Sequence, residues 1–301
     1  MINVIRFQRV ALIGFGEAGS ILGEDLTKAG CAVATYDLLL SSPTARAAMI
    51  ARAGRANVVA ADSLRAAIEA ADLIISAVTA SSARDVARDV AAGVQAGQYF
   101  LDINSVSPAT KRENAEDINS AGAYYVEAAV MAPVPPQRLK VPMLLGGARA
   151  ASVAEALRGL GMNTTAISEE IGVASAVKMC RSILIKGLEA LTVESMLAAR
   201  RFGAEEQVLA SLQHTFPSMG WDGKLPDYLV SRVAEHGRRR AAEVREVART
   251  LRDVGLDPVM AEAIALRQDM LVDAMKAANI PYSADQPFEW RALADRLHQQ
   301  D

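Results

Sequence analysis

Short apolar runs alternate with helical stretches along the first half of the chain. Ser63 and Ser107 are residue types that commonly precede a helix, and Pro108 suits a first helical position. This alternation predicts a mainly parallel sheet covered by helices on both faces, in which ligands bind beyond the carboxyl ends of the strands. We expect strands at 9–13, 32–36, 57–60, 73–77, 99–103, 124–129, 143–145 and 163–166, and helices at 17–29, 43–52, 64–70, 83–92, 108–121 and 151–160.

The pattern changes near residue 170, where the strand-like runs stop. From Gly172 to about Arg201 there is no proline and only one interior glycine, Gly187. Such a stretch predicts a single helix roughly 40 Å long, at 1.5 Å per residue. Further helices are predicted at 205–214, 227–253, 258–278 and 288–298, with no convincing strand among them.

A glycine-rich turn follows the first predicted strand. Gly14 permits a tight turn, Gly16 leaves room for a pyrophosphate, and Gly19 lets the following helix pack closely on the strand. Free N–H groups at the start of that helix, with the positive end of its dipole, face bound phosphates. Asp37 ends the second predicted strand, at the spacing where a carboxylate accepts hydrogen bonds from ribose hydroxyls. The pattern predicts a dinucleotide-binding turn, rather than an ordinary turn of another α/β unit, with contacts from Gly14, Phe15, Gly16, Glu17, Ala18 and Gly19.

Asp37 also bears on the choice of cofactor. Its charge would meet the 2′-phosphate of NADP at close range, which favours NAD. Residues 38–40 are all leucine and offer no arginine to pair with that phosphate. Ser41, Ser42 and Arg46 can still reach it, so NADP stays an alternative.

The predicted organisation is α/β: an N-terminal Rossmann domain with a mainly parallel sheet at 1–168, a long interdomain helix, and an all-α substrate and dimerisation domain at 169–301. The chain has 301 residues, 51% of them hydrophobic, which is enough for two domains with sizeable cores. A net charge of -3 gives no reason to expect nucleic acid. No apolar run is long enough to span a bilayer, and the first residues have no secretory apolar region.

The cysteines and the charged clusters narrow the chemistry further. Cys31 and Cys180 are the chain's two cysteines, which argues against a disulfide framework and favours a reducing cytoplasm. No cysteine–histidine or carboxylate cluster has metal-ligand spacing, so we expect no metal. Residues 238–240 are three arginines. This run could steer an anionic substrate, but a solvated helix face in which one arginine turns inward is the favoured interpretation. For Trp221, packing between helices is favoured over closure of a pocket.

Two loops follow later strands at the ligand edge of the predicted sheet. Asn104 and Ser105 emerge after the fifth strand, where an amide and a hydroxyl can orient a substrate carboxylate or hydroxyl. A simple capping loop is an equal alternative. Residues 130–136, Val-Met-Ala-Pro-Val-Pro-Pro, form either a rigid apolar wall of the same pocket or a structural connection.

Lys178 lies among small and apolar residues in the first turns of the long helix. Apolar surroundings and the positive helix end both disfavour an ammonium, so we expect the pKa of Lys178 to fall toward neutrality. Such a lysine can take a proton from an alcohol and return one to a carbonyl. Ser182 follows one turn later on the same face. The spacing alone favours a lysine whose amine reaches out to solvent over a catalytic lysine.

Taken together, residues 14–19, residues 102–108 and the helix from Gly172 to Lys178 resemble the β-hydroxyacid dehydrogenases, which include 3-hydroxyisobutyrate and 6-phosphogluconate dehydrogenases. The C-terminal part resembles a branch with a phosphogluconate-dehydrogenase-like domain of unknown function. The resemblance implies that a nicotinamide cofactor binds the glycine turn beside Val78 and Thr79. It further implies that the loop after the fifth strand anchors the substrate, and that Lys178 is the general acid/base of hydride transfer.

Several positions depart from the pattern of this family. Asn104-Ser105 replaces a serine–threonine pair, Ser182 replaces an asparagine, and a lysine–aspartate pair falls on Ala242-Glu243. His236 and Arg239 can occupy the space of the missing lysine. These departures leave redox chemistry on a small β-hydroxy acid or related alcohol in place and the identity of the substrate open.

Two other functions compete with a dehydrogenase. An imine reductase shares the architecture but typically lacks the helix lysine, so Lys178 argues against it. A non-catalytic protein that senses the cofactor is the third hypothesis. The resemblance and the apolar excess of the helical half imply a homodimer.

Overall fold

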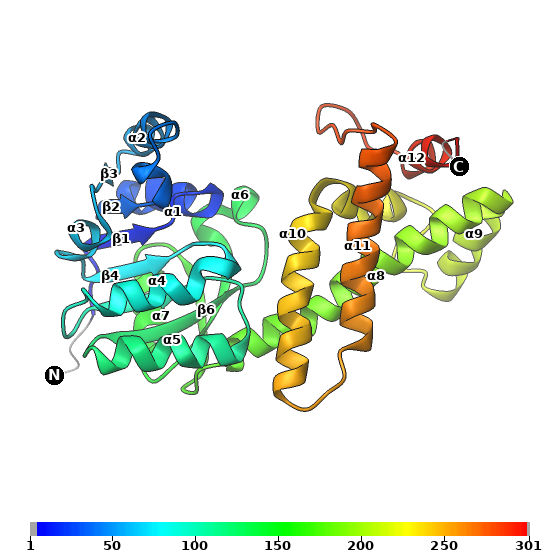
Figure 1. Ribbon diagram of the computed structural model, residues 1–301. Helices are drawn as coiled ribbons and strands as arrows, with labels where there is room; N and C mark the ends of the chain where they lie inside the picture. Colours follow the sequence, from blue (N-terminus) through cyan, green and yellow to red (C-terminus); the bar gives the residue numbers. More distant parts are fainter. Residues whose placement is uncertain (1–4, 300–301) are drawn as a thin grey trace. The chain divides into compact units, whose positions relative to one another are not determined.

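The computed structural model describes residues 5–299, and the chain divides into two compact units between Lys178 and Met179. Unit 1 contains the sheet, and unit 2 is helical (Figure 1). The dividing point lies inside a long helix, α8 (Val173–Phe202), which begins in unit 1 and continues into unit 2. The domain boundary expected between residues 168 and 169 stays a prediction.

Unit 1 is organised around one sheet. Within the described residues the sheet has eight strands in the order β3-β2-β1-β4-β5-β6-β7-β8. All neighbouring strands are parallel except β6 and β7, which run antiparallel. The predicted α/β class with a mainly parallel sheet is therefore confirmed. The strands are β1 (Arg9–Ile13), β2 (Ala32–Tyr36), β3 (Val59–Ala60), β4 (Leu73–Ser76), β5 (Tyr99–Asp102), β6 (Tyr124–Val130), β7 (Pro142–Gly146) and β8 (Asn163–Ser168).

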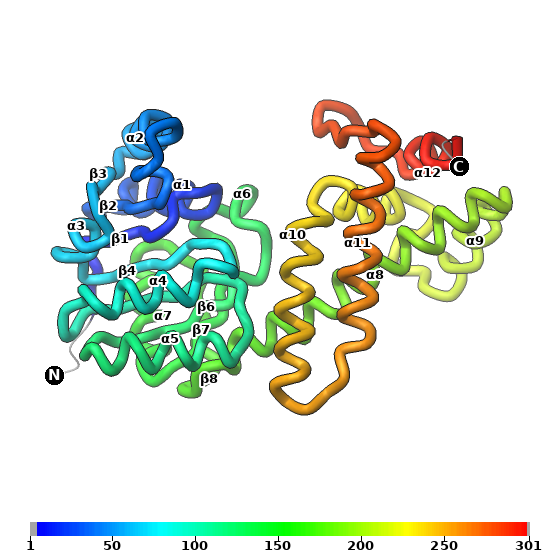
Figure 2. The backbone as a smooth tube through the Cα atoms, in the orientation of Figure 1, coloured from blue at the N-terminus to red at the C-terminus, as the bar shows by residue number. Residues whose placement is uncertain are grey.

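Alternate residues of β1 supply cores on both faces of this sheet. Val10 and Leu12 cluster with side chains of α1, α2 and α7, whereas Ala11 and Ile13 cluster with side chains of α3, α4 and α5. Figure 2 shows α4 and α5 side by side. A strand buried on both faces is a continuous apolar run, which explains its clear sequence signal. The helices are α1 (Glu17–Lys28), α2 (Arg46–Arg55), α3 (Leu64–Ile68), α4 (Ala83–Ala91), α5 (Pro108–Ser120), α6 (Val134–Gln137) and α7 (Ala150–Gly159).

Unit 2 packs its helices around an apolar core. The core contains Val193 of α8, Val233 and two tryptophans, Trp221 and Trp290. Burial of Trp221 agrees with the packing role that was favoured for it. The helices α10 and α11 lie side by side (Figure 1). After α8 come α9 (Glu205–Thr215), α10 (Leu225–Asp253), α11 (Val259–Ala277) and α12 (Trp290–His298).

Charged side chains are also buried inside unit 2, between α8 and α10. Arg240 donates from Nε to Oε2 of Glu189 at 2.7 Å, and Lys186 Nζ lies 2.9 Å from Oε2 of Glu243. Burial lowers the pKa of Lys186 and raises the pKa of Glu189. Arg238 and Arg239 are exposed, so one arginine of the run turns inward, as predicted.

Within residues 5–299, no helix combines the length and the apolar character that a membrane span requires. Over the same residues, no group of three or more histidine, cysteine, aspartate or glutamate side chains is arranged to hold a metal ion.

Candidate cofactor and catalytic site

The glycine-rich turn joins β1 to α1 at the carboxyl edge of the sheet. Gly14 has a positive φ of 90°, and its N–H donates to the carbonyl of Tyr36 at 2.9 Å. A side chain at Gly19 would collide with the carbonyl oxygen of Gly14, because the helix packs directly on the turn. Gly16 is exposed, and apart from its two chain neighbours no described residue reaches within 4 Å of the place for its Cβ. Because the N-cap of α1 is Gly16, which has no side chain to cap the helix, the first amides and the positive end of α1 fit a pyrophosphate.

Asp37, at the end of β2, is held against this turn. Its Oδ2 accepts from the N–H of Phe15 at 2.7 Å, and its Oδ1 accepts from the N–H of Leu39 at 2.9 Å. Each carboxylate oxygen has a further lone pair, which leaves acceptors for ribose hydroxyls. Arg46, a candidate partner for a 2′-phosphate, is engaged in an ion pair with Asp62 at 2.8 Å. The arrangement fits NAD.

Arg52 of α2 is a site residue that sequence reasoning missed. Its guanidinium donates to the carbonyl of Phe15 at 3.2 Å, so a positive charge lies beside the glycine turn. The two residues are 37 positions apart, and only the fold brings α2 to the turn. No local pattern around Arg52 signals this contact.

The side chain of Asn104 forms hydrogen bonds with other residues of unit 1. Its Oδ1 accepts from the N–H of Val78 at 2.7 Å, and its Nδ2 donates to Oγ of Ser76 at 2.9 Å. The side chain is buried, so it links the end of β4 to the loop after β5. Thr79 Oγ1 lies 3.1 Å from Oγ of Ser82, next to Val78 at the same edge. We therefore assign Asn104 to the loop's own structure rather than to substrate contact.

Ser105 and Lys178 meet within unit 1. The amine of Lys178 donates to Oγ of Ser105 at 2.6 Å, although the residues are 73 positions apart. Both residues are half-buried. Ser107 caps α5, and its Oγ accepts from the N–H of Thr110 at 3.2 Å. Ser107 is therefore the helix cap of this loop, whereas Ser105 is the serine for which a substrate contact is predicted.

Beneath this loop lies a buried ion pair at the end of β5. Asp102 is fully buried, and its Oδ1 lies 2.8 Å from Nζ of Lys111. Asn114 and Tyr125 donate to Oδ2 at 3.1 and 2.7 Å. Burial alone would raise the pKa of Asp102, but the charge of Lys111 and these hydrogen bonds outweigh it and hold the pKa below its ordinary value of 3.8.

A second buried carboxylate, Glu127 of β6, caps the helix that carries Lys178. Its Oε1 accepts from the N–H groups of Gly172 and Ala174 at 2.6 and 3.1 Å. Its Oε2 accepts from the N–H of Ser175 at 3.3 Å. The first amides of α8 are therefore satisfied by a carboxylate, a favourable partner for a helix N-terminus.

The other predicted site residues lie in unit 2. Ser182 is half-buried on α8, four residues after Lys178. Nε2 of His236, on α10, lies 3.3 Å from Oε2 of Glu235. Burial lowers the pKa of His236 below 6.5, against the opposing charge of Glu235. Contacts of Ser182 and His236 with a substrate stay predictions.

The loop after β6 packs on α1. Val134–Gln137 forms the short helix α6, which was not predicted, and it is followed by Arg138 with a positive φ of 52°. The guanidinium of Arg138 pairs with Asp25 at 2.6 Å and with Glu24 at 2.8 Å. Of the two interpretations offered for this segment, these contacts favour the structural connection.

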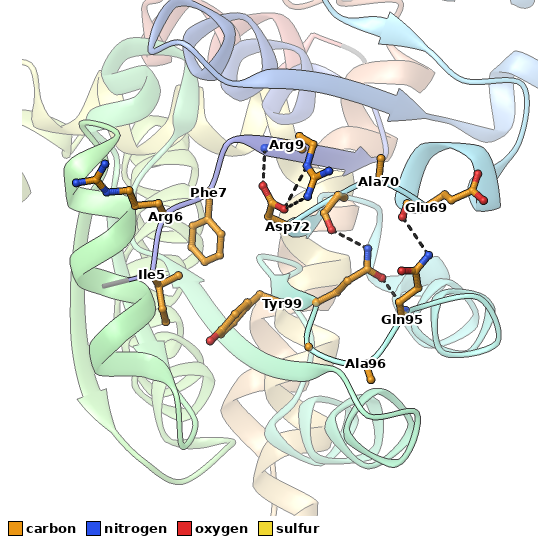
Figure 3. Close-up of a pocket in the computed structure, with 13 residues that line it drawn as sticks. Ile5, Arg6, Phe7, Arg9, Glu69, Ala70, Asp72, Gln95, Ala96 and Tyr99 are labelled. Carbon is orange, nitrogen blue, oxygen red and sulfur yellow. Dashed lines mark hydrogen bonds and ion pairs between the residues drawn. The ribbon is translucent and has the colours of Figure 1, made fainter. Parts of the chain in front are cut away.

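A surface pocket of about 500 Å³ lies at the opposite edge of the sheet (Figure 3). It is lined by the chain around Phe7, by residues before β4 and β5, and by Tyr99, the first residue of β5; Arg9 and Asp72, which form an ion pair, also line it. These positions are at the amino ends of the strands. The pocket is therefore separate from the glycine turn.

A sheet of this order with an open glycine turn and an acidic residue after β2 defines a dinucleotide-binding protein. Residues 9–167 match the NAD binding domain of 6-phosphogluconate dehydrogenase, and residues 199–271 match a domain of unknown function, DUF1932. The chain belongs to the NAD-binding β-hydroxyacid (3-hydroxyacid) dehydrogenase family, and its first domain binds NAD(P).

Individual proteins are similar to this chain at several levels of identity. A conserved hypothetical protein from Sinorhizobium meliloti 1021, of known structure, is 38% identical, covers 98% of this chain and 97% of its own, and superposes with a TM-score of 0.79. An uncharacterised 28.5 kDa protein of Methanothermus fervidus is 29% identical over 84% of this chain and 94% of its own length. Mitochondrial 3-hydroxyisobutyrate dehydrogenase of Homo sapiens is 24% identical over 70% of this chain, and the match spans 63% of that enzyme.

Two glycine substitutions separate the roles of the turn. Gly16→Ala changes the free energy of unfolding by less than about 1 kcal/mol, because the position is open, but the methyl group obstructs the pyrophosphate and weakens NADH binding at least about tenfold. Gly19→Ala costs about 1–3 kcal/mol because its methyl group meets the Gly14 carbonyl. Urea unfolding and NADH fluorescence titration measure the two effects. Unchanged NADH affinity in Gly16→Ala would contradict the proposed phosphate position.

Acid should weaken unit 1 through Asp102. Its folded pKa is lowered, so the unfolded chain binds the proton first as the pH falls below about 5, and the stabilisation present at neutral pH is lost progressively through the folded pKa. Asp102→Asn is less stable than the parent at pH 7, and the difference shrinks toward pH 3. Urea unfolding across this pH range tests the expectation. A constant difference would show that the charge of Asp102 is not responsible.

Proposed function

We propose that the protein is an NAD(P)-dependent oxidoreductase that transfers hydride between nicotinamide and a β-hydroxy acid or related alcohol. The observation that carries this proposal is the 2.6 Å contact between the Lys178 amine and the Ser105 hydroxyl. Both groups lie in the same compact unit as the glycine turn. An amine and a hydroxyl held together can bind an alcohol oxygen and exchange its proton.

The proton and the hydride leave the substrate separately. Bound nicotinamide supplies the acceptor for the hydride of the carbinol carbon. An uncharged Lys178 takes the proton of the substrate hydroxyl as the carbonyl forms, and in the reverse direction the ammonium returns it to the carbonyl oxygen. Ser105 orients the same oxygen or a neighbouring carboxylate by a hydrogen bond. Ser182 and His236 stay candidates for further substrate contacts.

NAD is the proposed physiological cofactor. The carboxylate of Asp37, fixed by two backbone N–H groups, puts negative charge where a 2′-phosphate would bind. Arg46 is occupied by Asp62 and by the carbonyl of Leu40. These contacts favour a free ribose over a phosphorylated one.

Turnover of a panel of β-hydroxy acids and alcohols with NAD tests the function. Lys178→Ala should lower kcat by about 10²–10⁴-fold, the usual worth of a general acid/base, while the Kd for NADH changes less than twofold. Lys140→Ala, an exposed lysine of the same unit, is the control and should leave both unchanged.

Each other result points elsewhere. Reduction of cyclic imines that is indifferent to Lys178→Ala identifies an imine reductase. NADH binding without turnover of any substrate in the panel identifies a cofactor-binding protein without this activity. Either outcome overturns the proposed role of Lys178.

We also propose a homodimer formed through unit 2, in a reducing cytoplasm that suits the free thiols. Leu184 and Leu191, seven residues apart on α8, have exposed fractions of 77% and 60%, and Leu266 of α11 is 60% exposed. Residues at this spacing share a helix face, and burying such a stripe favours association.

Light scattering at micromolar concentration should give twice the chain's 32.0 kDa mass. Leu184→Glu should shift the protein toward monomer, because it places a charge in the apolar stripe. Val59→Glu in unit 1, where Val59 is 67% exposed, is the control and leaves the mass unchanged. A monomeric parent would refute the proposed dimer.

A further inference from the structure

Two buried carboxylates stand opposite each other at the carboxyl edge of the sheet. Asp102 of β5 and Glu127 of β6 are register partners in neighbouring parallel strands. Both residues have an exposed fraction of 0%. A buried charge is costly unless every oxygen has a partner, so each carboxylate must have a use in the fold.

Asp102 sets the path of the loop that carries Ser105. Its Oδ1 accepts from the N–H of Asn104 at 2.9 Å, immediately before Ser105. Lys111 of α5 donates to the carbonyl oxygen of Asp102 at 2.8 Å and also pairs with its carboxylate. The backbone is therefore fixed on both sides of Ile103, where the loop leaves the strand.

Glu127 sets the start of the helix that carries Lys178. It accepts from three amides within the first turn, the last of them that of Ser175, three residues before Lys178. Space for the carboxylate comes from β7, because a Cβ at Gly146 would stand 2.5 Å from Oε1 of Glu127. The position and rotation of this turn decide where the Lys178 amine points.

We propose that Asp102 and Glu127 are paired positioning residues, which hold the Ser105 loop and the first turn of α8 at the separation that lets hydroxyl and amine meet. The inference rests on the proposed function for its catalytic consequence. Ser105 and Lys178 are 73 positions apart along the chain. The short structural connection between them runs through the adjacent strands β5 and β6, where Asp102 and Glu127 are register partners. Misplacement by about 1 Å costs a reacting pair on the order of 10²-fold in rate.

Glu127→Gln and Glu127→Ala form a graded test. The glutamine oxygen can still accept from Gly172 and Ala174, while its NH₂ group faces the N–H of Ser175, so one contact is lost; alanine loses all three. We expect kcat to fall by about 10-fold and 100-fold respectively, with the Kd for NADH within twofold of the parent. Ser63→Ala, which removes the side-chain cap of α3, is the matched control and leaves kcat unchanged.

A second readout needs no substrate. Competitive acetylation with acetic anhydride, followed by peptide mass spectrometry, reports the accessibility of the Lys178 amine, and hydrogen exchange reports the amides of Gly172, Ala174 and Ser175. Acetylation and exchange should rise at least about threefold in Glu127→Gln, rise further in Glu127→Ala, and stay constant in Ser63→Ala.

The two readouts keep this inference separate from the proposed function. If the parent shows no turnover, the proposed function fails and Lys178 acetylation still decides the positioning role. Lower thermal stability in Glu127→Gln with parental acetylation, and with parental kcat where there is turnover, would overturn the inference. If Glu127→Ala does not fold, Glu127→Gln carries the test.

Discussion

Where the strands of unit 1 end, backbone N–H groups leave the sheet and must find partners in a region sheltered from water. After β5 the partner is the buried carboxylate of Asp102, after β4 it is the Asn104 amide, and between β8 and the first turn of α8 it is the buried carboxylate of Glu127. Removing one member of such an arrangement leaves another buried polar group unsatisfied, at a cost of about 1–3 kcal/mol and more for a charge. The Ser105 loop, the end of β4 and the start of α8 therefore depend on the same edge.

Much of the fold could be predicted because its signals are local. Buried strands are continuous apolar runs, and Ser63 and Ser107 cap the helices that they precede. The prolines of Val134–Gln137 predicted a loop, but the segment forms a short helix. A proline is tolerated in the first turn of a helix because the N–H that it lacks would have no partner within the helix. The antiparallel direction of β7 relative to β6 has no local signal in the sequence, so it could not be predicted.

The site was predictable in part, for a related reason. The glycine turn and the acidic end of β2 are fixed spacings within one βαβ unit, so the sequence identifies them. By contrast, Arg52 and Glu127 act on partners 37 and 45 or more positions away, and their roles appear only when α2 and α8 are in place. Arg240 is intermediate: the arginine run indicated one inward side chain, but burial of Glu189 decides which one.

The environment of Asn104 bears on what the site can recognise. A serine at this position would be too short to bond both Ser76 and the N–H of Val78, whereas the amide reaches both at 2.9 and 2.7 Å. The Asn104 amide is therefore engaged with the end of β4, next to the glycine turn, and is not available to a substrate. Ser105 is then the side chain of this pair that remains directed to Lys178. In the reaction that we propose, one polar anchor instead of two favours a substrate with fewer hydrogen-bonding groups near its reacting carbon, because each unmatched polar group would be desolvated without compensation.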